Sequence, residues 1–91
     1  MKPSTKLLDR KVAIRELRSI PTDQLLARYD QALKAQADAT LAAEYGSANR
    51  KPAAQRLLVL HRLDASWVAF TLYTLCLKHG LIKSSGIDPL S

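Results

Sequence analysis

The sequence predicts an all-α protein of three helices, in which the two longer helices form an antiparallel hairpin. Apolar residues recur at helical spacing along most of the 91 residues. Prolines and glycines stand where helices of this spacing would begin or end: Pro21, Gly46, Pro52 and Gly80. A chain of this length makes one domain. We expect residues 1–83 to form it and residues 84–91 to be a flexible tail.

The first predicted helix runs from about Thr5 to Ser19, with Ser4 as its N-cap. Four apolar positions share one side of it and form a stripe that another helix can cover: Leu7, Ala13, Ile14 and Leu17. Three basic residues follow one another on the adjoining side: Lys11, Arg15 and Arg18. The pattern therefore predicts a short amphipathic helix with a basic face.

Ile20 and Pro21 end this helix, because proline disfavours the helical conformation of the residue before it. Thr22 is the expected N-cap of a second helix from Asp23 to about Tyr45, and Gly46 is the expected stop. Its buried side is predicted from apolar spacing: Leu25, Leu26, Tyr29, Leu33, Ala37 and Thr40.

The third predicted helix begins at Pro52 and ends near Gly80. Thirteen consecutive residues between Asp64 and Lys78 carry no charge, and apolar side chains surround this half of the helix. Such a helix is covered on more than one side. The other two helices are amphipathic, and one is short, so we expect some apolar surface to remain for a second copy or a protein partner. A compact monomeric bundle is the alternative.

Aromatic side chains concentrate at interface hot spots. The candidate residues for a dimer or partner interface are accordingly Trp67, Phe70, Tyr73 and Leu77.

The formal net charge is +6, and it is unevenly distributed. Residues 1–19 carry six basic and two acidic groups, residues 20–46 carry two and four, and residues 47–91 carry six and two. The basic face of Lys11, Arg15 and Arg18 would steer an acidic protein or DNA toward the molecule. A solvated surface without a partner is the alternative.

The sequence offers little catalytic chemistry. Cys76 is the only cysteine, His61 and His79 are far apart, and no phosphate-binding or nucleophile motif is present. We therefore expect a protein that is not an enzyme and uses no cofactor or metal. The start of the chain lacks the apolar segment of a signal peptide, and thirteen uncharged residues are too few to span a bilayer. These features predict a cytoplasmic protein.

Two segments resemble a known family. "LRSIPTDQL" leads through a proline into a long helix, and "RLLVLHRLDASWVAFTLYTLCLKHGLIK" is a long apolar helix that closes on glycine. Together they resemble the TraM-type antiactivators of conjugative elements, and the similar QseM-type antiactivators, over about residues 16–83. This resemblance implies a dimeric helical hairpin that binds a LuxR-family quorum-sensing activator, blocks its binding to DNA and so represses conjugative transfer.

A small DNA-binding accessory protein of a mobile element is the alternative function. The basic side chains could contact successive phosphates. The short turn of a helix-turn-helix is missing, however, and no aromatic residue is interleaved with the basic ones.

Overall fold

The computed structural model describes residues 7–82, which contain three α-helices and no strand. Helix α1 spans Arg10–Arg18, α2 spans Thr22–Glu44 and α3 spans Pro52–Lys78. A short 3₁₀ turn, η1 (Ser47–Asn49), joins the two long helices. The predicted fold class is therefore confirmed.

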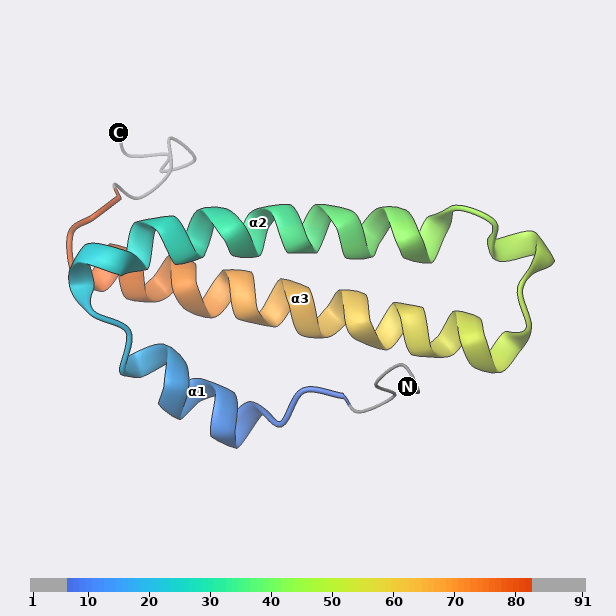
Figure 1. The fold of residues 1–91 in the computed structure, drawn as a ribbon, viewed down its shortest axis with the longest axis horizontal. Coiled ribbons are helices and arrows are strands. Elements are labelled where there is room, and N and C mark those ends of the chain that lie inside the picture. Colours follow the sequence, from blue (N-terminus) through green and yellow to red (C-terminus); the bar gives the residue numbers. More distant parts are fainter. Residues whose placement is uncertain (1–6, 83–91) are drawn as a thin grey trace, which may run out of the picture.

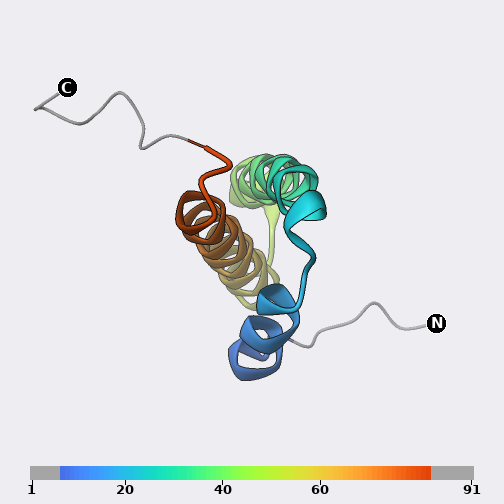
Figure 2. The same ribbon diagram turned by 90° about the vertical axis from the view of Figure 1, so that its left-hand side faces the viewer.

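Helices α2 and α3 pack along their lengths as an antiparallel hairpin, and α1 packs on α3 (Figure 1). Seen from the end of the hairpin, α3 lies between α2 and α1 (Figure 2). This arrangement explains why α3 is apolar on several sides: two neighbours cover it from different directions. Because α1 is short, it leaves part of α3 uncovered.

Helix α1 begins later than predicted. Its N-cap is Asp9, whose carboxylate accepts hydrogen bonds from the backbone N–H groups of Lys11 at 3.0 Å and Val12 at 3.4 Å. Aspartate caps a helix as well as serine does, and here it fixes the start. Residues 7–9 are not helical, which corrects the predicted start at Thr5. The predicted cap, Ser4, and Thr5 itself lie outside the described residues.

The two long helices begin and end within two residues of the predicted positions. Pro21 is the N-cap of α2, so Thr22 is its first helical residue rather than its cap. Helix α3 begins at Pro52 and closes in a Schellman motif: the Leu81 N–H donates to the Cys76 carbonyl at 2.9 Å and the Gly80 N–H donates to the Leu77 carbonyl at 3.1 Å. Gly80 has φ +71°, a conformation that only glycine adopts easily.

Side chains from the turn and from the start of α3 hold together the end of the hairpin at which the turn joins α2 to α3. The guanidinium group of Arg50 donates to the Tyr45 carbonyl at 2.7 Å and to the Gln55 side chain, and Gln55 donates to the Ala43 carbonyl at 2.7 Å. The last carbonyl groups of a helix have no hydrogen-bond donor within the helix, and here Arg50 and Gln55 donate to them. Arg50 thus has a structural role in the turn.

The core lies where α2, α3 and the end of α1 meet. Its buried members come from all three helices: Leu17, Leu25, Ala32, Ala69, Leu72 and Cys76. The predicted tail, residues 84–91, lies outside the described residues.

The buried side of α2 differs from the prediction. Leu25 is buried as expected, but Leu26, Leu33 and Ala37 are exposed, while Ala32 and Ala43 are buried. Alanines at the contact allow two helices to approach closely. The alanine-lined side of α2 therefore faces α3, and the larger leucines lie to one side of the contact.

Candidate protein-interaction surface

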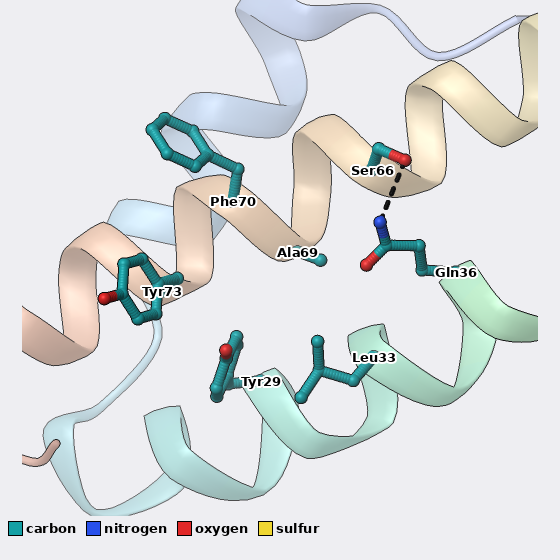
Figure 3. A pocket seen from close by; sticks show the side chains of 7 residues that line it. All are labelled: Tyr29, Leu33, Gln36, Ser66, Ala69, Phe70 and Tyr73. Carbon is teal, nitrogen blue, oxygen red and sulfur yellow. Dashed lines mark hydrogen bonds between the residues drawn. The ribbon is translucent and has the colours of Figure 1, made fainter. Parts of the chain in front are cut away.

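An apolar groove runs between α2 and α3. Its walls are formed by side chains of both helices (Figure 3): Tyr29, Leu33, Gln36, Ser66, Ala69, Phe70 and Tyr73. The space between them is about 440 Å³ and opens to solvent. A second hollow shares Tyr29 and Leu33 and continues along α2, with four further lining residues: Asp23, Leu26, Ala27 and Asp30. We call the two hollows together the hairpin groove.

Side-chain size explains why there is a groove at this position. Ala69 is buried at the base, where its methyl group fills little space between larger neighbours. The rings of Tyr29 and Tyr73 contact each other across the helices, with centroids 5.9 Å apart and planes tilted by 42°. At the other end the Gln36 side-chain amide donates to the Ser66 hydroxyl at 3.1 Å. The groove is thus aromatic at one end and polar at the other.

Large apolar side chains border the groove without being covered. Phe70 is 64% exposed, Leu26 48% and Leu33 40%. An isolated exposed leucine is ordinary, but Leu33 and Phe70 line the first hollow, and Leu26 and Leu33 line the second. Exposed apolar side chains gathered in this way are typical of an interaction site. Burying such a patch against a partner would be favourable by about 25 cal/mol per Å² of apolar surface.

The structure brings two of the four candidate interface residues together. Phe70 and Tyr73 line the groove. Trp67 does not line it, and the Arg10 guanidinium lies over its ring, 5.3 Å from the centroid, so Trp67 contacts the N-terminal part of the domain. Leu77 is half-buried one turn beyond Tyr73 and is not among the groove's lining residues.

Besides Phe70 and Tyr73 of α3, three large side chains of α2 line the groove: Leu26, Tyr29 and Leu33. Apolar spacing alone assigned them to the buried side of α2. Alanine positions in the sequence would not have separated the two sides of α2. Ala32, Ala39 and Ala43 are buried or half-buried, whereas four other alanines of the same helix are exposed: Ala27, Ala35, Ala37 and Ala42.

The predicted basic face lies on the surface of α1. Lys11, Arg15 and Arg18 are all exposed, and none of the three lines the hairpin groove. Arg15 and Arg18 stand in the last turn of α1, where positive charge also stabilises the helix dipole. The basic face and the groove are therefore two separate surfaces.

Asp64 attaches the N-terminal segment to α3. Its carboxylate accepts the backbone N–H of Leu8 at 3.1 Å and pairs with Arg10 at 3.7 Å. Arg10 in turn covers the Trp67 ring. Since α1 is short, these contacts are a substantial part of what holds it in place.

Replacing Asp64 by alanine should loosen α1 while leaving the hairpin intact. Alanine removes both acceptor interactions and is itself a strong helix former in α3. We expect amide hydrogen exchange in residues 10–18 to become about tenfold faster, equivalent to ~1.4 kcal/mol. Exchange in the middle of α3 should be unchanged. Equal acceleration in both helices would show that Asp64 supports the whole fold.

Cys76 is completely buried, and its burial raises the pKa of the thiol above its ordinary value. A raised pKa suppresses the thiolate, the nucleophilic form. His79 is exposed and His61 is half-buried beside the N-terminal segment. Within residues 7–82, no group of three potential metal ligands comes together. The environment of Cys76 is therefore that of a core residue.

The raised pKa of Cys76 predicts a loss of stability in alkaline solution. Above about pH 8.5 the thiol ionises in the unfolded chain but stays protonated in the folded one, so ionisation favours unfolding. The free energy of unfolding should fall as pH rises through this range and should be unaffected below it. Urea titrations at several pH values measure the slope. In Cys76→Ala, which has no thiol, the fall in unfolding free energy that the thiol causes above about pH 8.5 should disappear. An unchanged fall in Cys76→Ala would show that other groups cause it.

None of the helices in the described part of the chain is long and apolar enough to cross a bilayer.

Comparison with family models, curated proteins and solved structures finds no match to this chain. By its fold and its surface, this chain is a helical hairpin domain with an apolar groove between its two long helices.

Proposed function

We propose that this protein is a small regulator, not an enzyme, that binds and inhibits a LuxR-family transcriptional activator. Binding would block the activator's engagement of DNA and so repress conjugative transfer. The observation that carries the proposal is the exposure of Phe70 at the α3 side of an aromatic groove that faces solvent (Figure 3).

The geometry of the groove supports binding of a protein. Exposed aromatic side chains around a pre-formed hollow are typical of interface hot spots. The groove runs along two packed helices, the arrangement that commonly receives a partner's helix. On α3 the exposed side chain of Phe70 lines the groove, and Leu26 and Leu33 of α2 contribute to the same apolar surface.

The choice of target comes from the resemblance of "LRSIPTDQL" and the long apolar helix to TraM-type antiactivators. An activator of this kind acts in the cytoplasm, which agrees with the compartment predicted from the sequence. The groove supplies a surface through which such inhibition would work.

A tagged pull-down from the native host, with and without nuclease, tests this function. We expect a transcription factor to be retained at stoichiometric amounts after nuclease treatment. Recovery of nucleic acid and its usual companions alone, with loss on treatment, would contradict the proposal and favour the DNA-binding alternative.

The exposed basic face of α1 supports that alternative, a DNA-binding accessory protein of a mobile element. It also fits a role in steering an acidic partner. Reversing the charges of Lys11, Arg15 and Arg18 together should slow association at low salt and have little effect at high salt, because screening already removes the long-range attraction. Stopped-flow measurements of the association rate at both salt concentrations decide this; an unchanged rate at low salt would remove the steering role.

The homodimer expected from the sequence remains a prediction. Sedimentation velocity of the wild-type chain and of Phe70→Ala tests it. A dimer present in both proteins would use a surface other than the hairpin groove and would leave the groove free for a target.

A further inference from the structure

We infer that the hairpin groove binds a basic amphipathic helix of a partner protein. The inference rests on the proposed function, because it names the kind of segment through which a target would be held. Its support lies in the length, polarity and charge of the groove.

The groove is long enough for three to four turns of a helix. From Asp23 to Gln36 it extends along α2 for 13 residues, or about 20 Å. A helix lying in it would present apolar side chains at every third or fourth residue to the hollow between Leu33 and Phe70.

The polarity of the lining favours a helix over an extended segment. An extended peptide needs partners for its backbone N–H and C=O groups, whereas a helix satisfies these groups internally. Gln36 and Ser66 are already hydrogen-bonded to each other at 3.1 Å, and the rest of the lining on both helices is largely apolar. The groove therefore offers side-chain contacts rather than a sheet edge.

The charge of the lining favours a basic segment. In a chain with a net charge of +6, two of the residues that line the groove, Asp23 and Asp30, are acidic and none of them is basic. Lys34 lies 3.4 Å from Asp30 and offsets one of the two negative charges, so these three side chains together carry a net charge of −1. The basic residues of α1 lie on another surface and are screened over about 8 Å at physiological ionic strength. Locally, the groove attracts positive charge.

The same charges argue against a second copy as occupant. Pairing two grooves face to face would bring the acidic residues of both copies into one interface. The basic amphipathic helix within this chain, α1, already buries Ala13 and Leu17 against its own domain. A second copy could supply α1 only by undocking it.

Selection from a displayed library of random peptides of about 16 residues, roughly four helical turns, tests the inference directly. The immobilised target is the full chain, with an excess of soluble Phe70→Ala protein to remove peptides that bind elsewhere. We expect the survivors to combine a net positive charge with apolar residues at helical spacing. They should bind wild type about tenfold more tightly than Phe70→Ala. Neutralising both aspartates, in Asp23→Asn/Asp30→Asn, should weaken them about threefold or more at low salt.

Leu41→Ala is the matched control for Leu26→Ala. Both leucines lie on α2 and both are 48% exposed, but only Leu26 is among the groove's lining residues. Peptide binding should fall in Leu26→Ala and not in Leu41→Ala.

Three results would overturn the inference: survivors that are acidic or lack helical spacing, no survivors under Phe70→Ala competition, or a wild-type dimer that Phe70→Ala converts to monomer. The last result would assign the groove to a second copy. Failure here is distinct from failure of the proposed function. An activator retained equally by wild type and Phe70→Ala would support the proposed function and refute the groove as its binding site. Selection of basic helices without retention of any activator would support the groove as a binding site and refute the proposed function.

Discussion

Replacing Leu72 by alanine is expected to destabilise the domain by about 2–5 kcal/mol. Leu72 is 2% exposed and belongs to the core formed by all three helices. Its truncation removes apolar burial and leaves a cavity that packed helices fill only in part. A domain of this size has a total stability of roughly 5–10 kcal/mol, so the loss would approach unfolding.

Urea denaturation followed by circular dichroism measures this effect. Leu41→Ala makes the same change at an exposed position of α2 and should alter stability by about 0.5 kcal/mol or less. A Leu72→Ala protein as stable as Leu41→Ala would contradict the packing of α3 described here.

Replacing Phe70 by alanine should greatly weaken binding of the target and change the free energy of unfolding only slightly. Its side chain is mostly exposed, and alanine is the better helix former, so the fold loses little. At an interface, loss of an aromatic hot spot costs about 2 kcal/mol or more, which is roughly 30-fold in affinity.

Titration of the isolated target with wild type and Phe70→Ala, by calorimetry, tests this prediction. Circular dichroism of both proteins should be the same. If Phe70→Ala loses its helical signal, Phe70 is a core residue; if it keeps both signal and affinity, the groove is not the binding surface.

The fold followed from local chemistry in the sequence. Pro21 and Pro52 restrict where helices can begin, and Gly46 and Gly80 have positive φ just after the two long helices end. These signals depend on one or two residues, so they can be read without tertiary information. The start of α1 was harder, because Ser4 and Asp9 are both good caps and the contact of Asp64 with the Leu8 backbone joins residues 56 positions apart.

The candidate site was less predictable. Residue type selects Phe70 and Tyr73 on the uncharged half of α3, but it does not tell which side of that helix α1 covers, and so it groups Trp67 with them. On α2 the leucines were assigned to the core because leucine is usually buried. In the structure Ala32 and Ala43 are buried instead of Leu26 and Leu33, since small side chains at the contact allow the two helix axes to lie closer together. Which of two apolar sides is buried depends on packing against the partner helix.

Competition between this protein and DNA for a LuxR-family activator tests the proposed inhibition through the hairpin groove. With the activator bound to a labelled operator fragment, fluorescence anisotropy reports its release as the protein is added. We predict that wild type and Leu41→Ala release the activator, and that Phe70→Ala requires about 30-fold more protein. Release by Phe70→Ala at wild-type concentrations, or no release by wild type, would contradict the account.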